Sequence, residues 1–473
     1  MNAKEPRKAT LAEALVTFVL LMVIMALGIV RYGLDPHIPM FCGVIIAALM
    51  AMHLGYPWRA IEDSMIAGIN RAMQSIIILA IIGILIGVWM VSGVVPTMIY
   101  YGLNILSPKI FLPAALLICS ITSLATGTSW GTAGTMGVAL IGIAHGLGVP
   151  VAVAAGAIIS GAYFGDKMSP LSDTTNLAPA MAGTDVFTHV KFMIPSTAVA
   201  YIITLVGYSV IGSRYGSAGA SLESVQAIQN GIVAQFTVSP FLLIPPLLVI
   251  GAIAKKMPAI PGIVLGILSA AALAPIFQHA SMGDILGSGY GGYVSESGVE
   301  VIDELLTKGG LEGMMFSISL TMIAMMFGGI VEMTGQLEAI VEKILKFFKG
   351  AAGLVFATEL TCVFSNITMP EQYISIVIPG RMYAKAYQDM GLHPKTLSNA
   401  LEGAGTVTSA LIPWNTCGVF LTTALGVSTA QYWKWCFFNI SMPITVVVMA
   451  FMGITVAYMT EDEKKILAET GRV

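Results

Sequence analysis

Long apolar segments recur along this chain and leave only short polar stretches between them. Segments such as 11–30, 76–99 and 313–334 each hold about 20 mostly apolar residues, which is the length that crosses a bilayer as a helix. Such segments cover most of the chain, because 56% of its 473 residues are hydrophobic and only 10% are charged. Within lipid every backbone polar group must bond inside the protein, so these segments must form helices. The sequence therefore predicts an all-α polytopic membrane protein with about 10 to 13 passes.

Charge and targeting signals narrow the class further. The net charge of −3 and the lack of a basic stripe argue against a nucleic-acid partner. Lys4, Arg7 and Lys8 precede the first apolar segment, and no signal-peptide cleavage site accompanies it. We expect a retained first helix whose N-terminus lies in the cytoplasm, in a prokaryotic inner (plasma) membrane. No cofactor is expected.

One polar stretch interrupts the apolar pattern. Residues 165–176 read Gly-Asp-Lys-Met-Ser-Pro-Leu-Ser-Asp-Thr-Thr-Asn between apolar flanks at 149–161 and 192–211. A charge at mid-bilayer depth costs about 2.5 kcal/mol or more, so such groups usually face a cavity, an ion path or one another. Pro170 predicts a broken helix, and unwound backbone at that depth is tolerated only inside protein or beside water. We predict an ion or substrate site in this stretch.

The chain repeats its pattern of interruptions at a spacing of about 240 residues. The first half is interrupted at 126–129 and 166–176, and the second at 365–368 and 403–416. Paired interruptions in corresponding halves indicate a transport site near the middle of the membrane. We expect a scaffold domain of continuous helices and a transport domain of four broken elements. The expected organisation is an N-terminal tail with the first transmembrane helix (1–37), a first repeat (38–212), a connector (213–236), a second repeat (237–459) and a polar C-terminal tail (460–473).

These interruptions supply hard oxygen ligands suited to a small cation. The candidate neutral ligands are Thr128, Ser129, Thr174, Thr175, Asn176, Ser365, Asn366, Thr368, Asn415 and Thr416, and the candidate carboxylates are Asp166, Asp173 and Glu402. Burial favours a protonated carboxyl and a bound cation favours an ionised one, so an aspartate here can hold either Na⁺ or H⁺. We place Na⁺ at Asp173, Asn176, Asn415 and Thr416, and the competing proton on Asp166 or Asp173. The second-half positions that match the two aspartates carry no acid, so we expect charge-coupled chemistry to concentrate in the first half.

Two basic residues are candidates for binding an anion. Lys167 is a counter-charge, a proton carrier or an anion-binding group; alternatively, its ammonium reaches the lipid headgroups. Arg381 carries a planar guanidinium that matches a carboxylate, although it also fits the role of an anchor at a helix end.

A serine motif gives the chain a remote enzymatic alternative. Residues 127–131 read Gly-Thr-Ser-Trp-Gly and fit the nucleophile pattern of serine hydrolases. That pattern is meaningful only on a strand–turn–helix elbow with acid and histidine partners, whereas here the flanks are apolar helix. An intramembrane serine hydrolase centred on Ser129 is thus the least favoured function.

Three motifs resemble those of the NhaC family of Na⁺/H⁺ antiporters. They are Gly-Thr-Ser-Trp-Gly-Thr at 127–132, the stretch at 165–176, and Pro-Trp-Asn-Thr-Cys-Gly at 413–418. The resemblance covers nearly the whole chain and implies a secondary active transporter that exchanges Na⁺ for H⁺ by alternating access. The wider ion-transporter superfamily implies two inverted-topology repeats, re-entrant hairpins, broken helices and a homodimer. The family also includes members similar to malate/lactate antiporters and amino-acid carriers, so a Na⁺- and H⁺-coupled exchanger of a small organic acid is the alternative.

Overall fold

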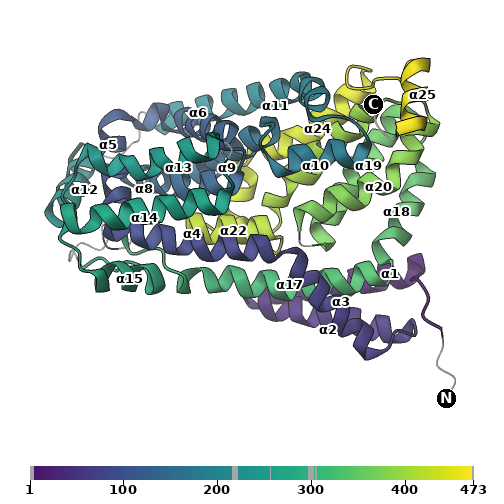
Figure 1. Ribbon diagram of the computed structural model, residues 1–473, viewed down its shortest axis with the longest axis horizontal. Coiled ribbons are helices and arrows are strands. Elements are labelled where there is room, and N and C mark those ends of the chain that lie inside the picture. The colour runs from purple at the N-terminus through teal and green to yellow at the C-terminus, as the bar shows by residue number, and fades with distance from the viewer. Residues whose placement is uncertain are drawn as a thin grey trace.

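Helices form almost all of the ordered structure. A computed structural model describes residues 5–215, 222–255, 257–296, 303, 306–369 and 371–470, and within these ranges only two isolated β-bridges accompany the helices. The all-α multi-pass fold predicted from the apolar segments is confirmed. The long helices run side by side along the long axis of the molecule (Figure 1).

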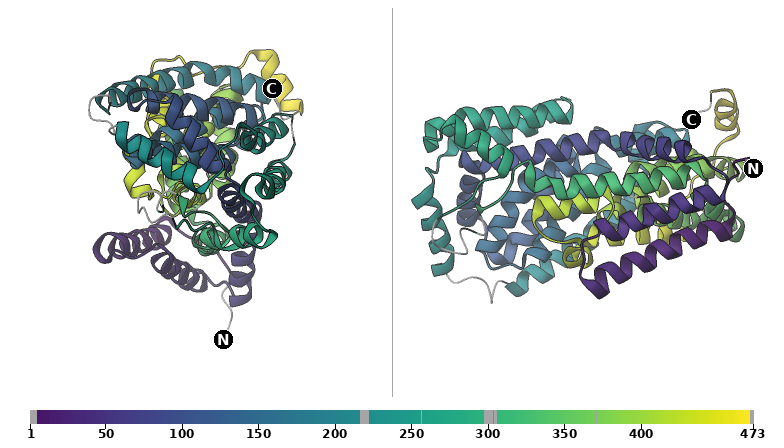
Figure 2. Two further views of the ribbon diagram at one scale, coloured as in Figure 1. Left: turned by 90° about the vertical axis from the view of Figure 1, so that its left-hand side faces the viewer. Right: turned by 90° about the horizontal axis from the view of Figure 1, so that it is seen from below.

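The elements of the N-terminal part are α1 (Leu11–Ala26), η1 (Leu27–Arg31), α2 (His37–His53), α3 (Trp58–Arg71), α4 (Met73–Val91), α5 (Val94–Ile105), α6 (Pro108–Thr126), α7 (Ser129–Thr132), η2 (Ala133–Gly137), α8 (Val138–Gly146), α9 (Val151–Met168), α10 (Asp173–Ala182) and α11 (Val186–Tyr215). Here α1 and α2 pack against each other, and α2 and α3 pack against α17 of the other half (Figure 2). The N-terminal helices therefore pack against the second half of the chain.

The elements of the C-terminal part are α12 (Leu222–Gln235), η3 (Pro240–Leu243), α13 (Ile244–Ala254), α14 (Ala259–Gln278), α15 (Met282–Gly291), η4 (Glu312–Met314), α17 (Met315–Met333), α18 (Gln336–Phe347), α19 (Gly350–Thr368), α20 (Gln372–Asp389), α21 (Pro394–Ala400), η5 (Leu401–Thr406), η6 (Val407–Leu411), α22 (Thr416–Leu425), α23 (Thr429–Tyr432), η7 (Trp433–Trp435), α24 (Phe437–Phe451) and α25 (Glu461–Thr470). Of the irregular helices, η1, η2 and η5 are π-helices.

Fewer helices cross a membrane by length and composition than the sequence suggested. Seven described helices are long and apolar enough, or up to nine if each of two bent pairs counts as one span. The expected 10 to 13 passes overestimate this number because the backbone divides some apolar segments into short pieces. The segment 405–427, for example, contains η6 and the short helix α22.

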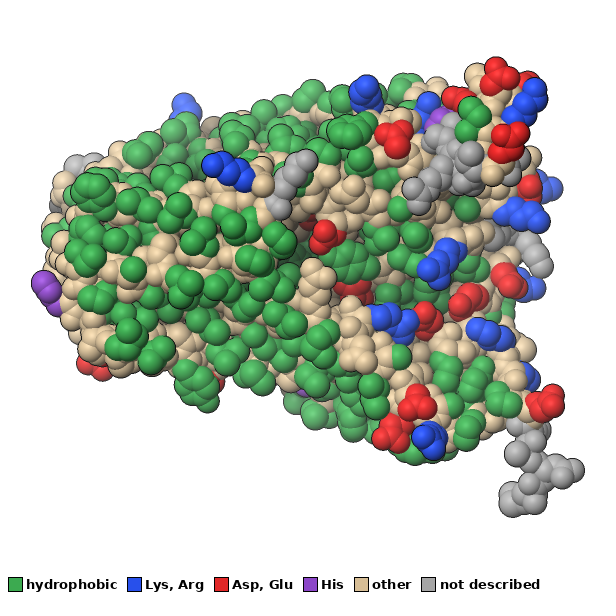
Figure 3. Space-filling model, in the orientation of Figure 1, with side chains coloured by type: hydrophobic (Ala, Val, Ile, Leu, Met, Phe, Trp, Pro, Cys, Tyr) green, Lys and Arg blue, Asp and Glu red, His purple; other side chains and the backbone are tan. Residues whose placement is uncertain are grey.

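The surface agrees with a bilayer environment. Hydrophobic side chains cover most of the face in Figure 3, and Lys, Arg, Asp and Glu gather mainly toward one end of the long axis. Both termini lie at that same end (Figure 1). The first and last described residues therefore lie at the same end of the molecule.

The predicted domain boundaries remain predictions. Residues 1–4, 216–221 and 471–473, which belong to the predicted tails and connector, lie outside the described residues. The described part of the connector includes α12, which is a helix rather than an irregular linker.

Candidate functional site

The predicted interruption at 165–176 is a break between two helices, α9 and α10. Thr175 donates hydrogen bonds of 3.0 Å to the main-chain oxygens of Asp166 and of Lys167, which lie in the last turn of α9. Asn176 donates bonds of 2.8 and 2.7 Å to two main-chain oxygens in the turn between the helices. The main-chain oxygens of Asp166 and Ser172 also accept bonds from the amides of Ser169 at 3.2 Å and Asn176 at 3.1 Å, and the side-chain bonds add to these at the helix ends. Thr175 and Asn176, which we predicted as ligands, therefore hold the broken backbone together.

The two interruptions of the first half meet at Asp166. Ser129, the first residue of α7, donates a hydrogen bond of 2.6 Å to Oδ2 of Asp166. Thr128 caps α7, and Gly127 before it has a φ of 68°. A Cβ atom on Gly127 would lie 2.7 Å from the carbonyl carbon of Leu171, so only glycine allows the two breaks to approach this closely.

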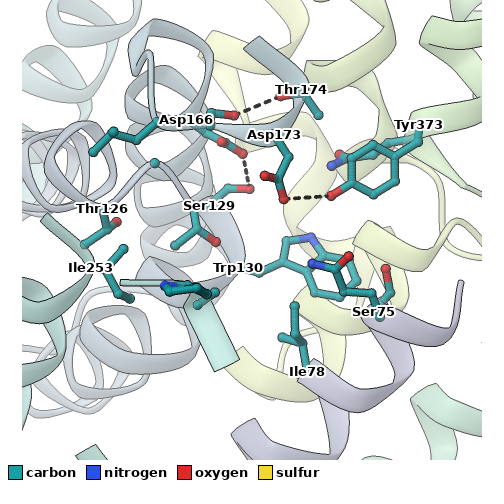
Figure 4. A pocket seen from close by; sticks show the side chains of 18 of the residues that line it. Ser75, Ile78, Thr126, Ser129, Trp130, Asp166, Asp173, Thr174, Ile253 and Tyr373 are labelled. Carbon is teal, nitrogen blue, oxygen red and sulfur yellow. Dashed lines mark hydrogen bonds between the residues drawn. The ribbon is translucent and has the colours of Figure 1, made fainter. Parts of the chain in front are cut away.

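A cavity of about 420 Å³ lies where these breaks meet. Asp166, Asp173 and Glu371 line it, and its described lining residues include no lysine or arginine. Asp173, in the first turn of α10, accepts a hydrogen bond of 3.5 Å from the hydroxyl of Tyr373 (Figure 4). Asp166 is only 5% exposed, whereas Asp173 is exposed. The cavity is therefore a polar, acidic space in which a cation would be stabilised.

Several lining residues were not among the predicted site residues. Glu371 lies at the tip of the hairpin formed by α19 and α20, where it caps α20 by accepting a 2.6 Å bond from the amide of Tyr373. Gln74 and Ser75 come from the first turn of α4, and Trp130 stacks on another ring from α22. For Glu371, the sequence did carry one signal of a site, because an acid lies at the tip between two apolar helices. Gln74, Ser75 and Tyr373 carried none.

The second half contains a matching break, between η6 and α22. Asn415 caps α22 and donates bonds of 3.2 Å to the main-chain and side-chain oxygens of Asn366. Asn366 in turn donates to the main-chain oxygen of Gly405 at 2.8 Å and to the hydroxyl of Thr408 at 3.0 Å. The predicted interruptions at 365–368 and 403–416 therefore contact each other, as their first-half counterparts do. The side-chain amide of each asparagine bonds to a main-chain oxygen of the other interruption, and the two side chains bond to each other.

The remaining neutral candidates of the second half lie close to this network. Thr368 donates a 2.8 Å bond to its own helix, and Thr416 donates at 3.5 Å to Asn415. The Ser365 hydroxyl is buried without a hydrogen-bond partner. None of the three lines the cavity described above.

The structure does not assemble the four residues to which we assigned Na⁺. No described hydrogen bond joins Asp173 or Asn176 to Asn415 or Thr416, and the latter two are fully buried. The cavity instead brings together Asp166, Asp173 and Ser129. The four-residue sodium site remains a prediction.

The expectation that charge-coupled chemistry concentrates in the first half stays a prediction, although the second half also has buried acids. Glu359, Glu371 and Glu402 of the second half are each at most 2% exposed. Lys167 is fully buried, and its ammonium contacts the sulfur of Met193 at 3.1 Å, so it does not reach the headgroups. Of the three acids, only Glu402 was among the predicted site residues.

A second cavity, of about 620 Å³, adjoins the first. Both cavities are lined by Asp173 and Tyr373, while Arg71, Glu332 and Arg381 belong to the second alone. Arg71 forms an ion pair with Glu332, whereas Arg381 is exposed and forms none with the described residues. The second cavity therefore offers one guanidinium beside the acidic site.

One wall of this second cavity lies close in sequence to a contact with the segment before α1. Glu332 is close in sequence to Thr334, whose main-chain oxygen accepts a 2.9 Å bond from the amide of Ala9. Acidic side chains are visible within the hollow on the face shown in Figure 3. The second cavity thus shares Asp173 with the acidic cavity and includes Glu332, which lies two residues before this contact with Ala9.

The serine motif has different partners from those of a hydrolase. Ser129 donates directly to a carboxylate, and its backbone belongs to a helix–helix break rather than a strand–turn–helix elbow. None of the described residues lining the cavity is a histidine. His189, which shares the first half with Ser129, is bonded to Ser398 at 2.8 Å.

Comparison with known proteins places the chain among transporters. Residues 161–454 match the Na⁺/H⁺ antiporter family. The Na⁺/H⁺ antiporter NhaC of Alkalihalophilus pseudofirmus is 38% identical over 95% of this chain and 97% of its own length. The malate-2H⁺/Na⁺-lactate antiporter of Bacillus subtilis is 37% identical over 91% and 92%, and the arginine/ornithine antiporter ArcD of Halobacterium salinarum is 36% identical over 97% and 95%.

Proposed function

Because the chain belongs to the Na⁺/H⁺ antiporter family, we propose that it is a sodium/proton antiporter that works by alternating access. The resemblance of its motifs to the NhaC family is confirmed by the family match and by the 38% identity to an NhaC antiporter. The chain is a transporter rather than an enzyme, which removes the hydrolase alternative.

One observation carries the proposal: the acidic cavity at the paired helix breaks. Asp166 and Asp173 face it, Ser129 bonds to Asp166, and no lysine or arginine is among its described lining residues. A partly desolvated carboxylate pair attracts a small cation and, in its absence, takes up a proton. We place Na⁺ in this cavity with Asp166, Asp173 and Ser129 as ligands. The exchanged proton occupies the same carboxylates when Na⁺ is absent.

We infer the membrane arrangement from the distribution of charge. Most of the Lys and Arg side chains visible in Figure 3 lie toward the end that carries both termini. Cytoplasmic loops carry an excess of such residues, so we place both termini in the cytoplasm of a prokaryotic cell. The inverted repeats, the division into scaffold and transport domains, and the homodimer remain proposals that rest on the family resemblance.

A second function is favoured by the position of Arg381. It lines the cavity that adjoins the acidic site, and it has no ion-pair partner among the described residues. A guanidinium binds a carboxylate with two parallel hydrogen bonds, so a small organic acid could bind here beside Na⁺. The malate/lactate and arginine/ornithine antiporters among the relatives support this alternative.

Reconstitution into proteoliposomes that contain an internal pH dye tests the main proposal. An outward Na⁺ gradient should acidify the lumen, Li⁺ should replace Na⁺ at least in part, and K⁺ should be inert. Absence of any Na⁺-driven pH change would refute sodium/proton exchange.

Labelled malate, lactate and arginine, added to the same vesicles, test the second function. Uptake that requires an opposing cargo would establish it. Arg381→Gln should then raise the half-saturating concentration of malate, whereas Lys385→Gln, which changes an exposed residue one turn further along α20, serves as the matched control. If neither variant changes malate uptake, Arg381 does not bind the acid.

A further inference from the structure

A cluster of three ionisable side chains lies inside the protein, outside both cavities. Lys167 and Glu402 are fully buried and Glu359 is 2% exposed. They come from α9, η5 and α19, and both carboxylates interact electrostatically with the Lys167 ammonium. None of the three lines the acidic cavity or its neighbour.

The cluster has unused hydrogen-bonding capacity. Among the described residues, neither carboxylate oxygen of Glu359 has a hydrogen-bond partner, and Oε2 of Glu402 also has none. Burial of an unpaired charge is costly, so such groups persist where they change protonation or hold an ion. With Lys167 charged and both glutamates ionised, the cluster carries one excess negative charge, and a single proton neutralises it.

The backbone of η5 allows the two glutamates to lie close together. Glu402 lies in the π-helix η5, a type of helix found frequently at functional sites. A Cβ atom on the next residue, Gly403, would lie 2.8 Å from Oε1 of Glu359. The Glu359 carboxylate therefore packs directly against the glycine backbone of η5, and the two acids are held in one compartment.

Thr174 connects this compartment to the acidic cavity. It lines the cavity, and its hydroxyl donates a 3.2 Å hydrogen bond to Oε1 of Glu402. The Thr174 and Ser172 hydroxyls lie 3.1 Å apart, and Ser172 also interacts electrostatically with the Asp166 carboxylate. Hydroxyls that accept one proton while donating another form a path along which a proton can move.

Other ionisable groups face the cluster from each neighbouring element. Asp166 faces Glu402, His189 of α11 faces Lys167, and Cys362 of α19 and Tyr387 of α20 face Glu359. Nε2 of His189 has no hydrogen-bond partner in the part of the chain that the structure describes. Lys167 is thus the one lysine or arginine of the described chain that acts on these two glutamates.

We propose that Lys167, Glu359 and Glu402 form an internal proton-holding site, separate from the sodium cavity and connected to it by the hydroxyl of Thr174. When the cavity holds no Na⁺, a proton passes to Thr174, which gives its own proton to Glu402, and the cluster becomes neutral. When Na⁺ enters, its charge favours the reverse transfer, and the proton returns through the same hydroxyl to the cavity and water. This inference rests on the proposed sodium/proton exchange.

Two fluxes in the same proteoliposomes test it. Exchange of labelled Na⁺ for unlabelled Na⁺ at equal pH needs no net proton transfer, whereas Na⁺-driven lumenal acidification does. Thr174→Val should lower the acidification rate by about tenfold or more, as expected for loss of a proton-transfer group. Its Na⁺/Na⁺ exchange should stay within about twofold of the unmodified protein, and Thr174→Ser, which keeps the hydroxyl, should restore acidification.

The controls separate the possible failures. Thr204→Val removes a buried hydroxyl of α11 that bonds only to its own helix, and Glu338→Gln removes a partly buried acid of α18; both should leave the two fluxes unchanged. Unchanged acidification in Thr174→Val, or a parallel loss of both fluxes, would overturn the relay. No Na⁺-driven acidification in the unmodified protein would instead refute the proposed function itself.

Glu402→Gln gives an independent measurement at the other end of the path. An amide cannot take up the proton, so acidification should fall while Na⁺/Na⁺ exchange persists. Equal acidification in Glu402→Gln and the unmodified protein would exclude Glu402 as a proton carrier.

Discussion

The hydroxyl of Ser129 donates a 2.6 Å hydrogen bond to Oδ2 of Asp166, although the two residues are 37 positions apart. The bond joins the start of α7 to the last turn of α9 and orients the carboxylate at the wall of the acidic cavity. A hydrogen bond to a charged acceptor contributes about 1.5–3 kcal/mol, so Ser129 favours the ionised, cation-binding form of Asp166.

Ser129→Ala should therefore weaken Na⁺ binding. Loss of that hydrogen bond favours protonation of Asp166, and the half-saturating Na⁺ concentration should rise by about tenfold or more. The half-saturating concentration is measured from the Na⁺ dependence of lumenal acidification in proteoliposomes. An unchanged Na⁺ dependence would remove Ser129 from the site.

Asp173→Asn should abolish Na⁺-driven proton movement. The side chain faces the cavity, and the substitution keeps its size while removing its charge and its ability to exchange a proton. Asp389→Asn, at the exposed end of α20, is the control and should behave as the unmodified protein does. Undiminished exchange in Asp173→Asn would exclude this carboxylate from the mechanism.

Lower pH should weaken the apparent affinity for Na⁺. A protonated carboxyl cannot serve as an anionic ligand, so protons compete with Na⁺ for Asp166 and Asp173, and raising the pH relieves the competition. The half-saturating Na⁺ concentration should increase by up to about tenfold for each pH unit lowered, as linkage requires for one-for-one competition. Initial rates measured over a series of equal internal and external pH values test this. A pH-independent Na⁺ affinity would contradict shared carboxylates.

Gly127→Ala should destabilise the fold more than an equivalent change elsewhere. The new Cβ would both strain a positive φ of 68° and meet the backbone of Leu171. Gly453→Ala is the matched control, because Gly453 has a φ of 76° but nothing within 4 Å of the place that a Cβ atom would occupy. The strain alone costs about 1–2 kcal/mol, and the added contact should lower the melting temperature in detergent further in Gly127→Ala. Equal melting temperatures for the two variants would show that the two breaks do not need their close approach.

Prediction from the sequence succeeded best where the physics is local. Apolar length alone predicts helices in lipid, and Pro170 with its polar neighbours predicts the break between α9 and α10, because both follow from contiguous residues. The role of a polar side chain was harder to predict, because it depends on its hydrogen-bond partner. Thr175 and Asn176 were chosen for their oxygens, yet their donors bind backbone within the break.

Residues distant in sequence account for most of what was missed. Gln74, Ser75 and Tyr373 have no unusual local context and become lining residues only because α4 and the tip of the α19–α20 hairpin lie at the same cavity as the break after α9. Glu402 was predicted as a carboxylate ligand, and Glu359 is a second acid within an apolar segment. Their proximity to Lys167 could not be inferred from a position-by-position comparison of the two halves.

By itself, the sequence determined the class of protein, the helical fold, the family resemblance and the places where the helices break, since these follow from hydropathy and short motifs. Only the tertiary structure decided which polar groups face the cavity, which ones hold the backbone, and which acids are buried beside Lys167. The physical reason is that a polar group in lipid must find a partner, and the packing of helices distant in sequence decides which partner it meets.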